Sequence, residues 1–597
     1  MESPQNPPYT KDRHLGAIFF RRVAELGDRT FVKLQRNERF EEISWRDFGA
    51  MVQKVLLALY AIGLAPGERV AIVGENSLQW LCADLATLAG GLPNAIVSPT
   101  LSDVMLLRIL GHSRCRAAFV QNPTGVGRLL NLKSQLPALS HIVVMEGEGA
   151  ESNLPNTLSF AQLVERGARV EAARLFEILE SVHGNDLATI MYTSGSTGEP
   201  KGVIRTQDNL LSNISNGGAI VRAAPEELFI IVLSLNHLFG RFGFLKSAVT
   251  GRTTAIIEAT ELELNVKLLE RLAGTSLAVV PRVMERIWQS MLEEDGNGEL
   301  WEQLETLDRK KTERAQLDGD ESRQFDELKA TLKNVVQKSL GGRIKYMSYA
   351  GAAMPPRIMR FFELIGIPLI GSYGSTECGG VTLSGIGDTK PGSLGKPFPN
   401  CELHIAEDGE LLVRGPTVTP GYFENPEATR EAIDPEGWFH TGDLGTIDPD
   451  GCLFITGRKK DIFNCSDGSN IYPGYIELLL ENEPFVRQAI LLGDRRPFIA
   501  ALIVPERKKI AGELHKEEST LTESEIATAL QSRIDQLNAR LEQFEKIRKF
   551  AVMRDDFSDE VRTLTVFQKI KVDRKAVEQR YQKEIDEIYG LAEEGRA

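Results

Sequence analysis

A loop at residues 193–202, TSGSTGEPKG, holds the side chains best suited to chemistry. The apolar run 187–192 before it has the length of a short buried strand. Glycines in such a loop let backbone N–H groups approach a ligand closely, and clustered N–H groups bind anions. Hydroxyls and one lysine add further donors, so the candidate ligands are Thr193, Ser194, Gly195, Ser196, Thr197, Gly198 and Lys201. We therefore predict a site for the phosphates of a nucleotide.

This loop differs from the common P-loop, in which a Gly-Lys-Ser/Thr run follows four spacer residues. Here Pro200 precedes the lysine and Gly202 follows it. A flexible surface linker is the alternative interpretation. Linkers rarely follow a buried strand with this order of residues, so the pattern favours binding.

A second group of polar side chains lies in the segment 371–377 (GSYGSTE), after the apolar run 367–370. Tyr373 offers an aromatic ring that can stack on a base, and the Thr376 hydroxyl can bond to a phosphate oxygen. Glu377 offers a carboxylate, and one carboxylate together with substrate phosphates commonly holds Mg²⁺. Such turns are common, but the phosphate-binding loop elsewhere in the chain makes this one a strong candidate.

Four further stretches carry candidate ligands. Gly351 and Ala352 follow a predicted strand at 343–349, where small residues would let a flat ring approach the backbone. Asp443 lies in a glycine-bounded turn, and a carboxylate there can accept two O–H donors. By contrast, the basic stretch 457–461 (GRKKD) would ordinarily be a solvated turn. A lone histidine beside apolar residues, such as His237, is usually a packed core residue.

Taken together, these segments resemble the motifs of the acyl-adenylate-forming enzymes, a family of acyl-CoA synthetases, peptide-synthetase adenylation domains and luciferases. The resemblance spans roughly residues 15–590. It implies that the adenine lies at Gly351 and Ala352, that Thr376 bonds the α-phosphate, and that Asp443 and Arg458 contact the ribose. It also implies that His237 borders the acyl pocket. Lys460 would lie near a hinge to a mobile C-terminal domain.

The resemblance also implies a catalytic lysine in the segment 564–571 (LTVFQKIK), which lacks the usual Pro or Gly before it. Aligned on the Leu-Thr pair at 564–565, this lysine is Lys569. Aligned on KVDRKA at 571–576, as in peptide-synthetase domains, it is Lys571. The Leu-Thr spacing also matches long-chain synthetases, which favours Lys569.

Two features indicate the long-chain acyl-CoA synthetase branch. The segment 280–288 (VPRVMERIW) is similar to a motif of those enzymes, and they typically carry a helical insertion where residues 293–333 form a charged, helix-favouring insert. Leucines 300, 304 and 307 recur there at helical spacing, and we expect a solvated helical pair rather than a partner site. Residues 466–477 resemble the turn and helix that face the CoA tunnel, with Ser469 where a basic or bulky residue is usual.

The elements between the motifs predict an α/β fold with mainly parallel sheets covered by helices, because continuous apolar strands alternate with helices. Strands are expected at 69–74, 94–97, 117–121, 141–146, 228–234, 253–257 and 277–280, helices at 43–61, 77–89 and 102–110, and a loop at 147–160. We expect a large N-terminal domain, 1–457, and a small mobile α+β lid, 458–597. The lid would have strands at 488–493 and 498–505 and helices at 524–545 and 574–590.

Composition limits the alternatives. At 597 residues the chain is too long for one hydrophobic core, and its net charge of −14 argues against nucleic acid as a partner. Six scattered cysteines without a CxxC pair suit reduced thiols and provide no zinc or disulfide framework. Neither a signal peptide nor a spanning helix is expected, so we predict a cytoplasmic enzyme. Peripheral membrane contact stays open.

The resemblance implies that ATP activates a medium- or long-chain fatty acid to acyl-AMP, with Mg²⁺ as cofactor, and that CoA then accepts the acyl group. An acyl-AMP ligase that loads an acyl carrier protein is the alternative. A third interpretation is a lipid-binding protein with a catalytically dead adenylation fold. The intact Thr376, Glu377, Asp443 and Arg458 argue against it.

Overall fold

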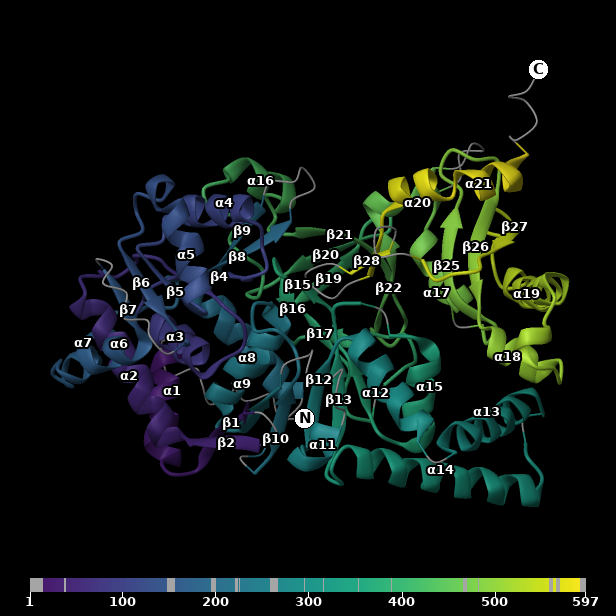
Figure 1. Cartoon of the computed structure of the whole chain (residues 1–597), viewed down its shortest axis with the longest axis horizontal. Helices are drawn as coiled ribbons and strands as arrows, with labels where there is room; N and C mark the ends of the chain where they lie inside the picture. Colours follow the sequence, from purple (N-terminus) through teal and green to yellow (C-terminus); the bar gives the residue numbers. More distant parts are fainter. Residues whose placement is uncertain are drawn as a thin grey trace.

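The computed structural model describes residues 14–36, 39–147, 156–194, 200–220, 224, 226–257, 267–294, 296–314, 316–352, 354–387, 389–464, 470–481, 483–557, 562–564 and 570–590. Two seven-stranded sheets with helices around them form the larger part of the molecule, and a smaller three-stranded sheet with its own helices lies at the C-terminal end (Figure 1). This arrangement confirms the predicted α/β class.

The first sheet has the strand order β7-β6-β5-β3-β4-β8-β9, and every pair is parallel except β8 with β9. Its strands are β3 (Val70–Val73), β4 (Asn94–Val97), β5 (Ala117–Val120), β6 (His141–Val144), β7 (Thr157–Ser159), β8 (Leu187–Ser194) and β9 (Pro200–Thr206). The connecting helices are α2 (Trp45–Ala61), α3 (Leu78–Ala89), α4 (Asp103–Ser113), α5 (Pro123–Leu132), α6 (Phe160–Ala168) and α7 (Arg174–Glu180). The predicted strands and helices of this region all form, with ends shifted by a few residues.

The second sheet has the order β14-β13-β12-β10-β11-β1-β2 and is parallel except for β1 with β2. Its strands are β1 (Thr30–Arg36), β2 (Arg39–Ser44), β10 (Leu228–Ile231), β11 (Thr253–Ile256), β12 (Ser276–Val279), β13 (Tyr346–Tyr349) and β14 (Leu369–Gly371). Helices α1 (Leu15–Leu26), α3, α8 (Gln207–Ile220) and α9 (Leu238–Thr250) contact one another between the two sheets, so both sheets share one hydrophobic core. Three more helices, α11 (Lys267–Leu272), α12 (Pro281–Glu293) and α15 (Pro356–Ile365), contribute buried residues to the same core.

The charged insert forms two helices, α13 (Asn297–Arg314) and α14 (Gly319–Ser339), as predicted. Its leucine face is not solvated, however, because Trp301 and Leu304 are buried in the main core and the Trp301 ring lies 5.1 Å from the Phe361 ring of α15. Only the outer, charged face of the pair meets water. The insert is therefore part of the large domain's core.

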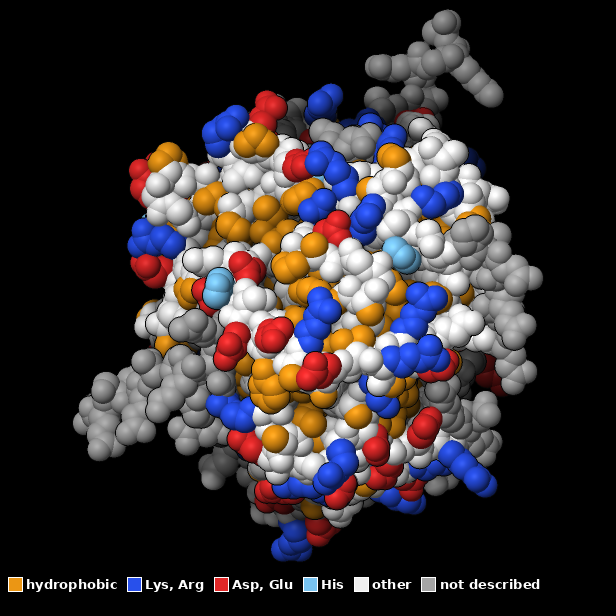
Figure 2. Space-filling view, turned by 90° about the vertical axis from the view of Figure 1, so that its left-hand side faces the viewer, with side chains coloured by type: hydrophobic (Ala, Val, Ile, Leu, Met, Phe, Trp, Pro, Cys, Tyr) orange, Lys and Arg blue, Asp and Glu red, His pale blue; other side chains and the backbone are white. Residues whose placement is uncertain are grey.

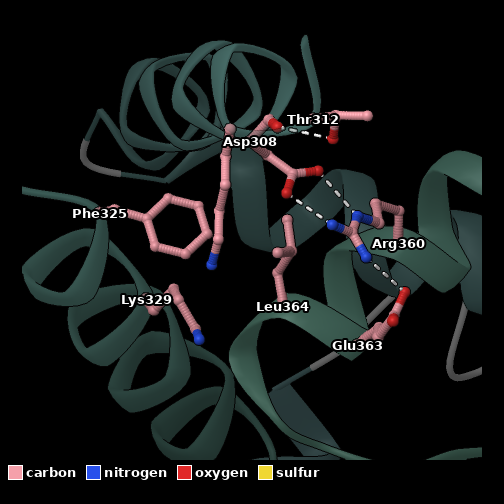
Figure 3. Close-up of a pocket in the computed structure, with 8 residues that line it drawn as sticks. Asp308, Thr312, Phe325, Lys329, Arg360, Glu363 and Leu364 are labelled. Atoms are coloured by element: carbon pink, nitrogen blue, oxygen red, sulfur yellow. Dashed lines mark hydrogen bonds and ion pairs between the residues drawn. The ribbon is translucent and has the colours of Figure 1, made fainter. Parts of the chain in front are cut away.

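A shallow hollow of about 330 Å³ lies between α13, α14 and α15 (Figure 3). Arg360 crosses it, with Nε 2.8 Å from Asp308 Oδ2 and Nη1 2.8 Å from Glu363 Oε2. The Lys329 ammonium lies 5.3 Å from the centre of the Phe325 ring. The residues that line the hollow include none of the predicted site residues, so we do not assign the hollow to the candidate site.

A four-stranded antiparallel sheet, β19 (Glu402–Ile405), β20 (Glu410–Arg414), β21 (Phe439–Ile447) and β22 (Leu453–Arg458), leads to the C-terminal part. There β25 (Val486–Leu492), β26 (Ile499–Pro505) and β27 (Ile547–Val552) form a sheet with two covered faces. Alternate residues of β26 face α17 (Pro473–Glu481) and α19 (Glu523–Asn538) on one side and α20 (Arg574–Arg580) and α21 (Gln582–Tyr589) on the other. This part therefore has its own hydrophobic core.

Three expectations about local structure are wrong in detail. The loop expected at 147–160 ends earlier, because β7 adds an edge strand and Ser159 caps α6. The helix expected at 524–545 ends at Asn538, and the one expected at 574–590 is two helices separated at Tyr581. Tyr581 has φ −112° and packs its ring 5.7 Å from that of Phe557. The non-helical conformation of Tyr581 ends the first helix.

The face of the molecule in Figure 2 carries Lys and Arg side chains intermixed with Asp and Glu. A nucleic-acid surface would need clustered basic residues. On this face no such cluster is visible. Within the described ranges, none of the helices is both long enough and apolar enough to span a bilayer.

A buried ion pair links the helices that lie between the two sheets. Arg241 of α9 and Asp84 of α3 are both 0% exposed, and Arg241 Nε donates to Asp84 Oδ2 at 3.0 Å. The same guanidinium donates to Thr189 Oγ1 of β8 at 2.9 Å and to Asn94 Oδ1 of β4 at 3.1 Å. Buried charges persist where they are paired and fully hydrogen-bonded.

Replacing Arg241→Met should lower the free energy of unfolding by about 3–5 kcal/mol, because it leaves the Asp84 carboxylate buried without a counter-charge. Urea denaturation followed by circular dichroism measures the change. The double variant Asp84→Leu/Arg241→Met removes both charges and should recover most of the loss. A single variant as stable as the wild type would contradict this interpretation of the pair.

Candidate functional site

The predicted phosphate-binding loop closes a β-hairpin at the edge of the first sheet. Thr193 and Ser194 of β8 lie opposite Lys201 and Pro200 of β9. The tip between the strands, with Gly195, Ser196, Thr197 and Gly198, lies outside the described residues. The hairpin nevertheless fixes where both ends of the loop must lie.

Several predicted residues follow the carboxyl ends of parallel strands in the second sheet, where α/β folds commonly bind ligands. His237 follows β10 and precedes α9, and it is half-buried. Gly351 and Ala352 follow β13, and Gly351 has φ +92°, which glycine adopts readily. Tyr373 follows the neighbouring strand β14. The topology therefore brings these four positions to one edge.

The carboxyl edges of the two sheets meet through Asn76, which follows β3 of the first sheet. Its Nδ2 donates to the Leu233 carbonyl at 3.0 Å, and its Oδ1 accepts from the Leu235 N–H at 2.8 Å. In return, Asn236 Nδ2 donates to the Gly74 carbonyl at 3.0 Å. These bonds hold the segment before His237 against the first sheet.

Glu377 lies at the tip of a small hairpin made by β15 (Gly374–Ser375) and β16 (Gly379–Gly380). The Ser375 hydroxyl accepts the N–H groups of Glu377 at 3.1 Å and Cys378 at 3.2 Å, which closes the turn. Gly379 has φ +67°, a conformation that disfavours residues with a Cβ. Thr376 and Glu377 are therefore held in one tight turn.

Tyr422 connects this turn to the phosphate-loop hairpin. Its hydroxyl donates to Glu377 Oε1 at 3.2 Å, and the Lys201 ammonium lies 5.2 Å from the centre of its ring. Burial raises the pKa of the Tyr422 phenol, which keeps it protonated as a donor. Sequence reasoning missed this residue, and its only signal was an aromatic side chain after the Pro-Gly pair at 420–421.

Tyr373, Asp443 and Arg458 form a second connected group. The Tyr373 hydroxyl donates to Asp443 Oδ2 at 2.6 Å, and Arg458 Nε lies 2.9 Å from Asp443 Oδ1. Asp443 lies within β21 and not in the turn expected from the sequence, and it faces Arg458 of β22. Tyr373 is only 7% exposed, and burial together with the Asp443 charge raises its pKa well above the usual range. Stacking of this ring on a base stays a prediction.

The carboxylates present fit one mode of Mg²⁺ binding. In the part of the chain that the structure describes, no three His, Cys, Asp or Glu side chains gather as a metal cage. Mg²⁺ commonly uses one or two carboxylates and completes its shell with substrate phosphates and water. Glu377, beside the phosphate-loop hairpin, fits that mode.

Other predicted residues lie in the C-terminal part. Lys460 is exposed in a short 3₁₀ helix, Lys459–Asp461, directly after β22. Strand β28 (Arg562–Leu564) pairs with β29 (Ile570–Val572), which places Lys571 opposite Thr563. Lys569 and Ser469 lie outside the described residues, so both lysine alternatives remain.

Comparison with known proteins identifies the family of the chain. Residues 19–423 match the family described as AMP-binding enzyme, and residues 460–593 match the AMP-binding enzyme C-terminal domain. The long-chain-fatty-acid–CoA ligase FadD15 of Mycobacterium bovis is 30% identical, with 98% of both chains covered. The long-chain-fatty-acid–CoA ligase ACSBG1 of Rattus norvegicus is 28% identical over 98% of this chain and 86% of its own.

Solved structures show the same fold. The anthranilate CoA ligase AuaEII in complex with anthranoyl-AMP superposes with a TM-score of 0.72 at 20% identity, covering 97% of this chain and 98% of its own. MatB from Rhodopseudomonas palustris with bound ATP gives a TM-score of 0.70 at 21% identity, covering 95% and 99%. With matches along nearly its whole length, the chain belongs to the AMP-binding enzyme family.

Proposed function

We propose that the protein converts a medium- or long-chain fatty acid, ATP and CoA into acyl-CoA, AMP and pyrophosphate. The observation that supports the proposal is that Lys201 and Glu377 contact the same tyrosine. The Lys201 ammonium lies 5.2 Å from the Tyr422 ring centre, and the Tyr422 hydroxyl donates to Glu377 Oε1 at 3.2 Å. The match to FadD15, which is named as a long-chain-fatty-acid–CoA ligase and aligns over 98% of both chains at 30% identity, supports the choice of acid and thiol.

The first half-reaction joins the acid to the nucleotide. A carboxylate oxygen of the acid attacks the α-phosphorus of ATP, and the bond from that phosphorus to pyrophosphate breaks. Charge on the phosphates must be neutralised, and preorganised donors and cations are the strongest means of doing so. Lys201, the loop N–H groups, the Thr376 hydroxyl and Lys569 would supply them, with Lys571 the alternative to Lys569. Glu377 would hold Mg²⁺, whose charge adds to theirs when it is bound.

The ribose would lie at Asp443. An ionised carboxylate offers about four lone-pair positions, and Tyr373 and Arg458 occupy two of them. The remaining positions can accept the two ribose hydroxyls without breaking the existing bonds. Gly351 and Ala352 would border the adenine, and His237 the acyl chain. In the second half-reaction the thiol sulfur attacks the acyl carbon, AMP leaves, and the thiol proton passes to solvent.

We also propose two domains, 1–457 and 458–597, that change their relative orientation between the half-reactions about Lys460. The two family matches, which end at 423 and begin at 460, support a boundary in this region. The separate core of the C-terminal sheet supports movement as a unit. A few residues in a connection suffice to absorb such a change.

Activity should rise with chain length for fatty acids from about ten carbons upward. Each buried CH₂ contributes about 0.8 kcal/mol, so kcat/KM should increase several-fold per two carbons until the pocket is full. AMP release with and without CoA, across a series of acids, measures this and identifies the acceptor. Equal activity from acetate to palmitate, or a preference for aryl or amino acids, would refute the proposed substrate class.

Replacing Glu377→Gln should slow fatty-acid-dependent ATP–pyrophosphate exchange by about 10²–10³-fold at limiting Mg²⁺, because one well-placed electrostatic contact is lost. The melting temperature should change little, since the amide can still accept the Tyr422 hydroxyl. Glu424→Gln is the matched control, as Glu424 pairs with Arg114 at the surface. Wild-type exchange in Glu377→Gln would remove this residue from the site.

Replacing Lys569→Ala should abolish acyl-AMP formation but leave conversion of added acyl-AMP and CoA to thioester near the wild-type rate. The reason is that charge neutralisation at the phosphates matters only in the first half-reaction. Lys571→Ala is the parallel variant, and loss of adenylation there alone would move the assignment to Lys571. Equal loss of both half-reactions in Lys569→Ala would contradict the proposal that this lysine serves only the first half-reaction.

A further inference from the structure

Arg205, on β9 four residues after Lys201, is a buried cation that the chemistry above does not use. Its side chain is 0% exposed and among the largest fully buried ones. Within the described ranges no carboxylate lies within ion-pairing distance of it, unlike Arg241, which pairs with Asp84. Burial lowers the pKa of Arg205 to about 10, although the nearby Glu377 charge favours the cation. A buried guanidinium without a salt bridge is costly, so its retention calls for a specific role.

The guanidinium is bonded to the backbone of two segments at the site. Nη2 donates to the Thr376 carbonyl at 2.7 Å, and Nη1 donates to the Thr417 carbonyl. The hairpin also packs directly on it, because a Cβ added at Gly379 would lie 3.2 Å from Arg205 Nη2. The rigid planar fork of a guanidinium can fix two carbonyl groups in one set geometry, whereas the ammonium of a lysine sits on a flexible stem.

Two asparagines continue this pattern at steps of four residues. Asn209 Nδ2 donates to the carbonyls of Pro416 at 2.8 Å and Val418 at 3.1 Å. Asn213 Nδ2 donates to the Gly380 carbonyl at 3.0 Å. Asn209 and Asn213, four residues apart on α8, lie on one face of that helix, and with Arg205 near the end of β9 they form one row of donors. That row holds the segments 376–380 and 416–418.

We propose that Arg205 is a positioning residue for adenylate formation. By fixing the Thr376 carbonyl it holds the Thr376 hydroxyl and the Glu377 carboxylate at a set place relative to the phosphate loop. The guanidinium belongs to the strand that closes the loop, so loop and turn move as one body. This inference rests on the proposed function, because the role is defined toward the nucleotide phosphates.

The test compares Arg205→Met and Arg205→Lys with Arg252→Met. Arg252 is another buried arginine, 1% exposed and 4.1 Å from the centre of the Phe229 ring. Three quantities are measured: the melting temperature, hydrogen exchange of the amides at 374–380, and fatty-acid-dependent pyrophosphate exchange. Arg205→Lys keeps the charge and one donor direction, so it tests the role if Arg205→Met does not fold.

In Arg205→Met we expect about tenfold faster amide exchange at 374–380, because the turn would open locally more often. We also expect about 100-fold lower kcat with little change in KM for the fatty acid, which is the loss expected for a misplacement of about 1 Å. Arg205→Lys should recover part of both. Arg252→Met should lose comparable stability but retain wild-type amide exchange at 374–380 and wild-type kcat.

Unchanged amide exchange at 374–380 in both Arg205 variants would overturn the proposal, as would an equal loss of kcat in Arg252→Met. The hydrogen-exchange comparison does not depend on turnover. If the wild type shows no fatty-acid-dependent exchange of pyrophosphate, the proposed function fails, while the amide data still decide whether Arg205 positions the turn.

Discussion

Strand β9 is bonded along both of its edges, and the geometry of the candidate site depends on this. On one side it pairs with β8 and closes the phosphate-loop hairpin. On the other side the Ile204 N–H donates to the Gly421 carbonyl at 3.1 Å, and the Phe423 N–H donates to the Gly202 carbonyl at 2.7 Å. A strand at the edge of a sheet otherwise presents unpaired backbone groups. Here those groups hold Tyr422, and through it Glu377, beside the loop.

The site therefore combines a rigid base with a separate C-terminal part. Its base is a junction of two parallel sheets whose shared core includes the fully bonded Arg241–Asp84 pair. The C-terminal sheet has a core of its own on both faces and follows the main part through β22 and the 3₁₀ helix at Lys459–Asp461. Lys459 Nζ lies 2.6 Å from Oδ2 of the exposed Asp408 and 3.0 Å from Oε2 of the buried Glu410. These ion pairs hold the residue before the proposed hinge against the four-stranded sheet.

The sequence predicts most of the large elements because their signals are strong. Continuous apolar runs mark the parallel strands, and Ser44 caps α2 as its pattern with Asp47 indicates. The hairpin of β1 and β2 and the three-residue strand β7 were not predicted, since short edge strands carry little periodicity. Local pattern cannot reveal which face of α13 packs on α15, because that depends on a partner sixty residues away, as Phe361 is from Trp301.

The same limit applies to the site. Asp443 and Glu377 could be named from the chain alone, because they stand in motifs that resemble those of the acyl-adenylate-forming enzymes. Tyr422 and Arg205 could not, since an aromatic after Pro-Gly and a charge inside a strand carry no motif. Their importance follows only from what they touch: a carboxylate oxygen in one case and two backbone carbonyls in the other.

The proposed function requires that a carboxylate oxygen attack the α-phosphorus of ATP. Turnover of a fatty acid labelled with ¹⁸O in both carboxylate oxygens, in unlabelled water, tests this step most directly. We expect AMP that carries one labelled oxygen and acyl-CoA that carries the other, measured by mass spectrometry. Unlabelled AMP, with the label in pyrophosphate or phosphate, would contradict it.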